Sequence, residues 1–309
     1  MDIAFTLVVH KDVRQIARLL RMIYRQNNYY FIHADSRSDV LFIEALRGVA
    51  TCFGANVEVR VAVHWGDESV LVPQITCAEQ ALRSRGTWKY LVNLVGQDFP
   101  LRTNLELVAA LKALNGSNLV ESVKMGRFAF RTNNKSLPLG ATWYKGSIYG
   151  AFRREFLHEA VMGTAVGPIR DLMLKLNYIR HPDEFYFPTL AYNSHLHLPG
   201  ACLYSPAPES EVGFNYLAKF VIWEGCSINC TTKYVRDVCI LGTDHVARLQ
   251  TVPHLFANKF HADYQPEAYD EMERWYFRRV EAEMKSGSYD RSTFDPTIYA
   301  ERLCSRYHI

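Results

Sequence analysis

Three short strings in this 309-residue chain combine polar side chains with Gly or aromatic residues in a way that suits a ligand site. Gly96-Gln97-Asp98-Phe99-Pro100 directly follows the apolar run 90–95, so a buried strand is predicted to end with polar groups at its tip. Ligands bind at this edge in open α/β sheets. The other strings are Pro182-Asp183-Glu184-Phe185, with adjacent carboxylates, and Phe256-Ala257-Asn258-Lys259-Phe260, with a cation among aromatic rings.

Lys259 lies within an aromatic-rich string, so it is expected to have a partner, whereas a cation is ordinarily an exposed surface charge. No two Asp residues stand two positions apart, so an Asp-x-Asp metal string is absent from the sequence.

Other combinations of metal-binding residue types are expected to be structural. His33-Ala34-Asp35 has no third ligand at a suitable spacing, and His195-Leu196-His197 places two His on one strand face. The seven Cys residues contain no C-x-x-C pair, which argues against a structural zinc. We therefore expect no metal site.

The first part of the chain alternates buried strands with helices. Strands are predicted at residues 3–9, 29–33, 57–63 and 90–95, and helices after Asp12, from Asp39 to Leu46, from about 68 to 85, and from Thr103. This alternation predicts an α/β fold with a mostly parallel central sheet and helices on both faces. Asp35 then ends the second strand, where a carboxylate can accept hydrogen bonds from uridine or ribose.

The pattern becomes irregular beyond about Leu119. Short strands are predicted at residues 119–123, 141–144 and 148–152, with helices around 171–176, after Asp183, and at 266–284 to close the chain. No repeat or clear linker interrupts the sequence. We expect one compact domain whose first half binds a nucleotide and whose second half shapes the substrate site.

Composition narrows the class of protein. With 35 basic and 32 acidic residues the net charge is +3, which is too balanced to indicate nucleic-acid binding. No signal peptide or membrane-length apolar run is present in the sequence. Sequons at Asn115, Asn134 and Asn229 favour a secretory compartment. Since Met1 is followed at once by a strand, we expect either a cytosolic protein or one whose N-terminal segment lies outside this sequence.

Nine strings in the chain resemble the core-2/I-branching β-1,6-N-acetylglucosaminyltransferase family, in family order and over nearly the whole length. They are Val8-Val9-His10-Lys11-Asp12, Tyr30-Phe31-Ile32-His33-Ala34-Asp35, Trp88-Lys89-Tyr90, Gly96-Gln97-Asp98-Phe99-Pro100-Leu101, Asn118-Leu119-Val120-Glu121, Gly146-Ser147, Pro182-Asp183-Glu184, Arg236-Asp237-Val238-Cys239 and Phe256-Ala257-Asn258-Lys259-Phe260.

The resemblance implies a GT-A-type glycosyltransferase fold in a single catalytic domain, residues 1–309. About 1–120 would form the nucleotide-sugar-binding half, and about 121–309 the acceptor-binding and catalytic half. It implies an inverting enzyme that moves GlcNAc from UDP-GlcNAc in β-1,6 linkage onto a galactosyl-GalNAc or related O-glycan acceptor, without a metal or other cofactor. It further implies a type II membrane protein of the Golgi lumen, whose N-terminal anchor is absent from this chain.

The resemblance also assigns roles to residues on the donor side. By position alone Glu184 is more readily explained as a first-turn acid favoured by a helix dipole than as a catalytic base. The resemblance reverses this preference, because the family's general base, which takes the proton of the acceptor hydroxyl, corresponds to Glu184. The family's diphosphate-binding cations correspond to Arg236 and Lys259, and its donor-site Asp to Asp35. Val9 and His64 fall near positions that contact uracil, although the family tends to have Tyr where this chain has His64.

On the acceptor side, Glu121, Lys124 and Arg127 match the family's acceptor-binding trio. A Trp/Tyr pair of the family aligns near Phe220 and Ile222, with Trp223 next to them. This departure leaves the particular acceptor open.

The Cys residues follow the family in part. The resemblance implies a Cys230–Cys239 bridge around Arg236, worth roughly 2–3 kcal/mol by the chain-entropy estimate. Cys52 matches a family Cys whose partner lies upstream of Met1. Phe31 stands where the family has a Cys that would pair near Cys77.

Two other readings stay open. Trp65-Gly66 and Ser69 lean toward the peptide O-xylosyltransferases of the same superfamily, so the chain could be a xylosyltransferase-like or other-sugar transferase. It could also be a catalytically silent glycan-binding homologue, although the presence of Glu184, Arg236 and Lys259 argues against this.

Overall fold

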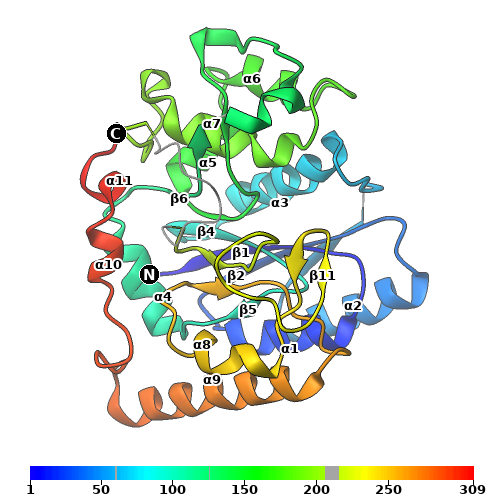
Figure 1. Ribbon diagram of the computed structural model, residues 1–309, viewed down its shortest axis with the longest axis vertical. Coiled ribbons are helices and arrows are strands. Elements are labelled where there is room, and N and C mark those ends of the chain that lie inside the picture. The colour runs from blue at the N-terminus through cyan, green and yellow to red at the C-terminus, as the bar shows by residue number, and fades with distance from the viewer. Residues whose placement is uncertain (60, 125, 206–215) are drawn as a thin grey trace.

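The computed structural model describes residues 1–59, 61–124, 126–205 and 216–309. Its centre is a six-stranded sheet in the order β3-β2-β1-β4-β9-β6 (Figure 1). The strands are β1 (Ile3–Val9), β2 (Tyr29–Ala34), β3 (Asn56–Glu58), β4 (Tyr90–Val95), β6 (Leu119–Val120) and β9 (Gly150–Arg153). The first four run parallel, while β9 is antiparallel to β4 and to β6.

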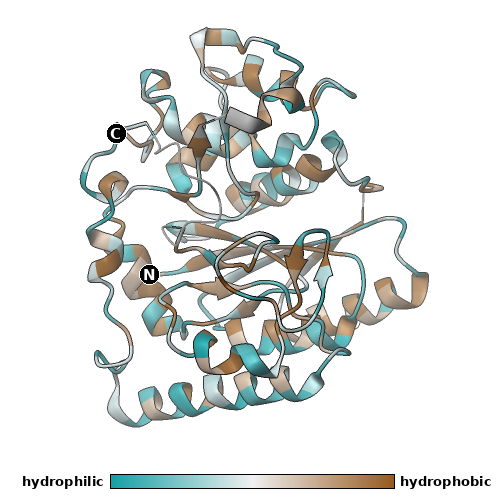
Figure 2. Ribbon diagram, in the orientation of Figure 1, coloured by the Kyte–Doolittle hydropathy of each residue, from teal (hydrophilic) through white to brown (hydrophobic). Residues whose placement is uncertain are grey.

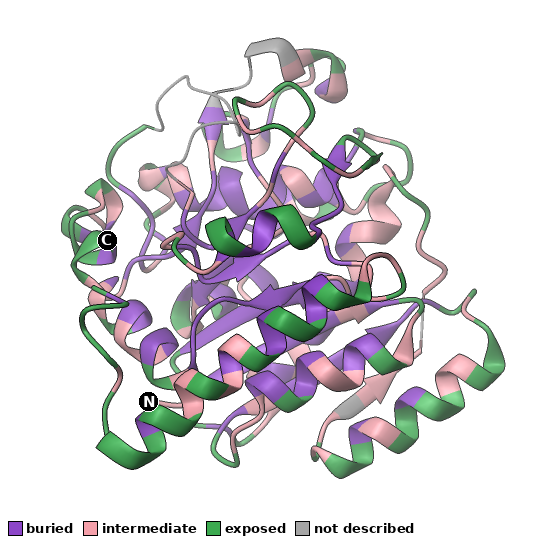
Figure 3. Cartoon of the chain, turned by 60° about the horizontal axis from the view of Figure 1, so that its bottom comes forward, coloured by how far each residue is buried: buried purple, intermediate pink, exposed green. Residues whose placement is uncertain are grey.

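Helices cover both faces of this sheet, as expected (Figure 1). One face packs against α1 (Val13–Ile23), α2 (Val40–Cys52) and α4 (Asn104–Ala113). The other packs against α3 (Leu71–Arg83), α5 (Arg154–Val161), α6 (Gly167–Met173) and α7 (Tyr186–Tyr192). The central strands are largely buried (Figure 3), and hydrophobic residues predominate in them (Figure 2). The predicted α/β architecture is confirmed.

Local sequence accounts for where several helices begin. Asp12 accepts a hydrogen bond from the Gln15 N–H at 3.1 Å and so caps α1. Asp39 caps α2 in the same way, through the Leu41 N–H at 2.8 Å. Thr103 and Glu106 form a capping box at the start of α4. All three starts agree with the sequence-based expectation.

A second, three-stranded sheet brings two of the sequence strings together. It has the order β10 (Lys219–Phe220), β13 (Phe256–Ala257), β5 (Phe99–Pro100). Antiparallel pairing of β13 with β5 joins the string that ends at Pro100 to the string that contains Lys259. The long helix α9 (Pro266–Ser286) packs against this sheet through Tyr269, Met272 and Tyr276, while its outer face is largely hydrophilic (Figure 2).

Two small hairpins complete the part of the fold that surrounds the site. β7 (Val123–Lys124) pairs with β8 (Tyr144–Lys145), and β11 (Tyr234–Val235) pairs with β12 (Val238–Cys239). Short 3-10 turns lie at Glu68–Val70, Gly126–Thr132, Pro138–Gly140, Pro182–Glu184, Ser194–Leu196 and Thr243–His245, and the short helix α8 spans Val246–Leu249.

Several predicted bounds are wrong. The strand expected at 57–63 ends at Glu58, because the following residues bond to the loop after β2: the Ser36 N–H donates to Val61 O at 3.0 Å, and the Val63 N–H to Asp35 at 3.4 Å. The helix expected at 171–176 lies earlier, at Gly167–Met173.

The helix at 266–284 does not close the chain. Two short helices follow it, α10 (Thr297–Ala300) and α11 (Leu303–Arg306), and a Cys202–Cys304 disulfide ties α11 to the body of the protein. No helix in the described ranges is long and apolar enough to cross a membrane.

Candidate active site

The carboxyl end of β2 carries a buried carboxylate, Asp35, next to the end of β1. The Asp35 N–H donates to Val9 O at 2.9 Å, and its carboxylate accepts hydrogen bonds from the Arg37 N–H and guanidinium, both at 2.9 Å. Arg37 in turn lies 3.4 Å from the Nδ1 atom of His64. The structure therefore brings together Val9, Asp35 and His64, the three residues expected on the donor side, and adds Arg37.

Hydrogen bonding decides the charge of Asp35. Burial alone would raise the pKa of this carboxyl, but hydrogen bonds from the backbone N–H groups of Arg37 and Val63 and from the Arg37 side chain outweigh it and lower the pKa. Asp35 is therefore ionised at neutral pH.

Arg236 occupies the turn of the β11–β12 hairpin. Arg236 and Asp237 both have positive φ, 51° and 63°, the backbone of a tight two-residue hairpin turn. The expected Cys230–Cys239 disulfide is confirmed and anchors β12. The Lys259 ammonium donates to Val235 O at 2.9 Å, so the two expected phosphate-binding cations lie against the same hairpin.

Further positive charge gathers at this place. Burial and the positive charges of Arg236 and Lys11 together lower the pKa of Lys259 to about 8. Burial and the charges of Lys11, Arg236 and Arg37 also lower the pKa of His10, against the opposing effect of Asp35. We call Lys11, Arg37, Arg236 and Lys259 the cation cluster.

Sequence reasoning missed Lys11 and Arg37. Lys11 comes two residues after β1 and Arg37 three residues after β2. The position of each residue just beyond a parallel strand could have indicated a role in the site, since ligands bind at that edge of the sheet.

Asp98, in the string that first suggested a site, is sealed inside the protein. It accepts hydrogen bonds from the Val95 N–H at 2.8 Å, the Lys219 ammonium at 2.5 Å and the Asn258 amide at 2.9 Å. Both Asp98 and the Lys219 ammonium are buried. This carboxylate therefore joins β4, β10 and β13 and does not face a ligand.

Glu184 ends the 3-10 turn Pro182–Glu184, and the aromatic residues that follow it point into the core. The carboxylate itself lies between two cations. Its Oε2 atom is 2.5 Å from Arg131 Nη1 and 3.2 Å from Lys145 Nζ. Its Oε1 atom makes no hydrogen bond to any residue that the structure describes, and the side chain is 23% exposed. The contacts that the structure describes therefore hold one oxygen of a side chain that is partly exposed.

Two other carboxyl groups lie near Glu184, and both are buried. Burial and the charge of Glu184 raise the pKa of Asp183 to about 8. Burial, with a smaller effect of Glu184 and against the charge of Lys145, raises the pKa of Glu121 to about 7. Of the three, Glu184 alone combines a fixed position with access to solvent.

Arg131 and Lys145 were not expected from the sequence. Gly146, next to Lys145, is the sequence feature that could have indicated the position of Lys145. Its N–H donates to Glu184 O at 2.8 Å, and a Cβ there would lie 2.0 Å from Glu121 O. This close approach needs Gly and brings β8 against the turn of Glu184.

The other residues expected on the acceptor side differ in where they lie and in how far the structure describes them. Lys124 lies in β7 and Arg127 in the following 3-10 turn, but their side chains lie outside the described part of the structure. Trp223 is partly exposed and its backbone bridges to Val238 in the hairpin of Arg236. Phe220 and Ile222 are buried.

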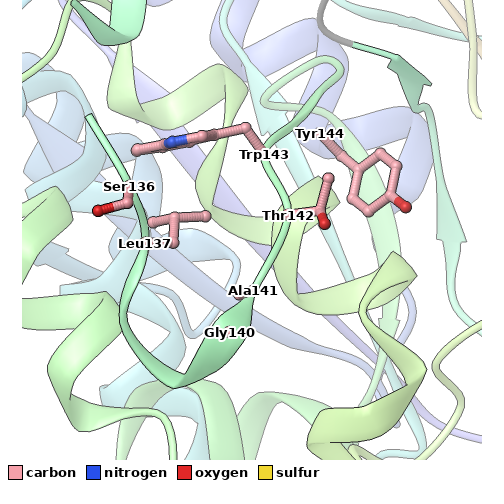
Figure 4. A pocket seen from close by; sticks show the side chains of 7 residues that line it. All are labelled: Ser136, Leu137, Gly140, Ala141, Thr142, Trp143 and Tyr144. Carbon is pink, nitrogen blue, oxygen red and sulfur yellow. The ribbon is translucent and has the colours of Figure 1, made fainter. Parts of the chain in front are cut away.

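A pocket of about 510 Å³ lies in the loop that leads into β8. Figure 4 shows the side chains of Leu137 and Trp143 on the two facing segments of this loop. The side chains of Thr142 and Tyr144 lie on the opposite side of the segment that carries Trp143. The Trp143 ring packs edge-on against Phe185, 5.7 Å between centroids. The pocket is thus close to the turn of Glu184. No three His, Cys, Asp or Glu side chains in the described ranges gather in a way that could hold a metal ion.

Comparison with known proteins gives one family. Residues 3–250 match the family described as Core-2/I-Branching enzyme. A mouse protein, beta-1,3-galactosyl-O-glycosyl-glycoprotein beta-1,6-N-acetylglucosaminyltransferase 4, is 33% identical over 292 residues, which cover 85% of this chain and 63% of the mouse protein. A bovine beta-1,3-galactosyl-O-glycosyl-glycoprotein beta-1,6-N-acetylglucosaminyltransferase is 30% identical over 84% of this chain and 66% of its own length. The chain thus spans about two thirds or less of these relatives.

A solved structure, a putative glucose-1-phosphate thymidylyltransferase from Bacillus anthracis, matches 55% of this chain and 78% of its own chain, with a TM-score of 0.33 and 9% identity. A likeness at that level carries no argument.

Proposed function

Since the chain belongs to the core-2/I-branching enzyme family, whose fold is GT-A-like, we propose that it is an inverting β-1,6-N-acetylglucosaminyltransferase. It transfers GlcNAc from UDP-GlcNAc to a galactosyl-GalNAc or related O-glycan acceptor. The names of the mouse and bovine relatives support both the donor sugar and the linkage. We further propose that residues 1–309 form one catalytic domain, with donor binding in about 1–120 and acceptor binding and catalysis in about 121–309.

The observation that carries this proposal is the partly exposed carboxylate of Glu184, whose Oε2 atom is held by Arg131 and Lys145. In the proposed reaction an acceptor hydroxyl oxygen forms a bond to the anomeric carbon. The bond from that carbon to the phosphate oxygen breaks, and its electron pair leaves with UDP. The hydroxyl proton goes to Oε1 of Glu184, which acts as the general base. Arg131 and Lys145 position the carboxylate, and this orientation is worth a large part of the rate in such reactions.

The cation cluster is proposed to bind the leaving diphosphate. Negative charge grows on the β-phosphate as UDP departs, and positive charges held close to it stabilise it. Of the four cations, Lys259 is partly buried, while Lys11, Arg37 and Arg236 are exposed. Arg236 and Lys259 make the principal contacts, with Lys11 and Arg37 beside them. On this view catalysis needs no metal ion. Val9, Asp35 and His64 bind the uridine.

The acceptor is proposed to bind near Glu184 through the segment that contains Glu121, Lys124 and Arg127, with Trp223 at the opposite hairpin. The buried position of Glu121 suits a role behind Lys145 as much as direct contact with a sugar. For the compartment we propose the Golgi lumen. The two disulfides support an oxidising environment, since such bonds are rare in the cytosol.

A donor screen tests the function. UDP release is measured from UDP-GlcNAc, UDP-xylose, UDP-galactose and UDP-glucose, with and without a galactosyl-β-1,3-GalNAc acceptor, in buffer that contains excess EDTA. Of the four donors, we expect only UDP-GlcNAc to give acceptor-dependent release of UDP. NMR of the product should show a new β-1,6 linkage. Release with UDP-xylose instead would favour the xylosyltransferase-like alternative, and UDP-sugar binding without turnover would favour a silent homologue. Activity that EDTA abolishes and Mn²⁺ restores would contradict the two-cation mechanism.

A further inference from the structure

Trp65 is a large aromatic side chain that the hydrophobic core does not explain. It lies in the loop between β3 and the 3-10 turn Glu68–Val70, and it is 66% exposed. A single exposed apolar side chain is ordinary on a protein surface, so exposure alone does not identify a site. The contacts of the ring indicate what it binds.

The indole touches both sides of the proposed active site. The Arg236 guanidinium lies 5.6 Å from the Trp65 ring centroid, within the range of a cation–π contact. The His181 ring lies 4.5 Å away at 72°. His181 starts the turn of the base, because the Glu184 N–H donates to His181 O at 3.0 Å. Trp65 thus joins a cation of the donor side to the turn that holds Glu184.

The backbone next to Trp65 is held firmly in this place. The His181 N–H donates to Gly66 O at 2.8 Å. Gly66 has a φ of +92°, and a Cβ there would lie 3.2 Å from the His181 ring. Because the loop needs Gly66 to approach His181, the position of the neighbouring indole is set by backbone contacts and not by burial of its own ring.

The chemistry of transfer defines what lies between these groups. The anomeric carbon of the donor is bonded to the β-phosphate, which we place on Arg236 and Lys259, and it is attacked by an oxygen whose proton goes to Glu184. The transferred sugar ring must therefore lie between the cation cluster and Glu184. Pyranose rings have a C–H face that packs on aromatic surfaces, as apolar groups do.

We propose that Trp65 forms the wall of the donor-sugar subsite and stacks on the pyranose ring of the sugar that is transferred. The ligand is the hexosamine ring of a UDP-sugar, and the inference rests on the proposed function. Trp65 thereby distinguishes the sugar part of the donor from its nucleotide part, which Asp35 and the cation cluster bind.

Calorimetric binding of UDP and of UDP-GlcNAc to the whole chain tests this, with the wild type, Trp65→Ala, Trp65→Phe and Arg236→Ala. For Trp65→Ala we expect ~10-fold weaker binding of UDP-GlcNAc and less than ~3-fold weaker binding of UDP, as loss of an aromatic stacking contact predicts. Trp65→Phe should retain most of the affinity for UDP-GlcNAc. Arg236→Ala should weaken both ligands by a similar factor. Trp275→Phe, on α9, is the matched control and should change neither.

The pattern of losses decides the outcome. Equal weakening of UDP and UDP-GlcNAc in Trp65→Ala would mean that the indole acts through Arg236 and would overturn the proposal, as would unchanged binding of UDP-GlcNAc. Thermal unfolding of each variant controls for folding, and an exposed side chain should leave the midpoint unchanged. A wild type that binds UDP-GlcNAc but transfers nothing would contradict the proposed function, while the ratio of the two affinities would still decide the role of Trp65.

Discussion

The two sides of the proposed active site are built in different ways. The donor side lies in the segments that directly follow β1, β2 and β13 and in the turn of the disulfide-anchored hairpin of Arg236, so most of its residues are next to the ends of strands. The base side consists of turns: Glu184 in a 3-10 turn, Arg131 in another, and Lys145 at the end of a two-residue strand. Charge is distributed differently as well, because cations gather on the donor side while Glu184 is held between opposite charges.

This contrast indicates a division of labour. Several cations gathered from different segments suit tight binding of a dianionic group, because the remaining contacts partly compensate when one is lost. A single carboxylate held by two partners suits a chemical step that depends on the position of one atom. Substitutions on the donor side should therefore change ligand affinity, and substitutions on the base side should change the rate of transfer.

The largest effect is expected on the base side. Glu184→Gln keeps the shape of the side chain and removes the proton acceptor, so kcat should fall by about 10²–10⁴-fold, the usual size of a general-base contribution. The affinity for UDP should hardly change. Initial rates and calorimetry measure the two quantities, with Glu155→Gln, a partly exposed carboxylate on α5, as the control. Near-normal turnover in Glu184→Gln would show that the base lies elsewhere.

Substitutions on the donor side come next. Arg236→Ala and Lys259→Ala should each weaken UDP binding by ~10–100-fold, as expected for loss of a hydrogen bond to a charged group. The double variant should lose less than the product of the two, because both cations act on one diphosphate. Lys233→Ala, an exposed Lys near the same hairpin, is the control. Strictly additive losses of UDP affinity in the double variant, or a lower kcat with unchanged affinity, would contradict the proposed difference between the donor side and the base side.

A smaller effect should follow from loss of a positioning residue. Lys145→Met removes the ammonium from Oε2 of Glu184 but keeps an apolar chain of similar length beside Phe128. We expect kcat to fall by ~10-fold, as misplacement of a catalytic group predicts, with the donor KM within ~2-fold. Lys145→Arg should recover part of the rate if its charge is what matters. A rise in donor KM at constant kcat would move Lys145 to the donor side.

The smallest effect concerns pH. The pKa of Lys259 is lowered to about 8, so in the free protein this group is charged below pH 8 and loses its charge as the pH rises through that value. UDP binding should therefore weaken above about pH 8, by ~3-fold at about pH 8.5, where part of the protein still carries the charge. Lys259→Arg keeps the charge at all these pH values and should remove the decline. If the wild type and Lys259→Arg weaken in parallel, another group controls the pH dependence.

Much of the donor side could be predicted from the sequence. The bounds of β1 and β4 and the helix starts at Asp12, Asp39 and Thr103 were predicted correctly, because strong local patterns determine them. Asp35 is at the end of its strand as expected. The strand expected to run to residue 63 was wrong, because hydrogen bonds to the neighbouring loop, which no local pattern reveals, ended the ladder at Glu58.

The Cys pairs show the same limit. Cys230 and Cys239 are nine residues apart and were expected to pair, whereas the Cys202–Cys304 bridge joins residues 102 apart and was not anticipated. Cys52, Cys77 and Cys226 are free thiols, and burial raises the pKa of Cys77 to about 12. Pairing over a long separation depends on how the last two short helices return to the body of the protein, and their sequences carry little periodic pattern.

By itself, the sequence of this protein determined the α/β alternation, the helix caps and the identity of the residues at strand ends, because these depend on neighbours a few positions away. Only the tertiary structure decided which charges meet. It sealed Asp98 between Lys219 and Asn258, and it brought Arg131 and Lys145 to one oxygen of Glu184. The physical reason is that electrostatic contacts depend on distances between side chains far apart in the chain, which only the packed fold sets.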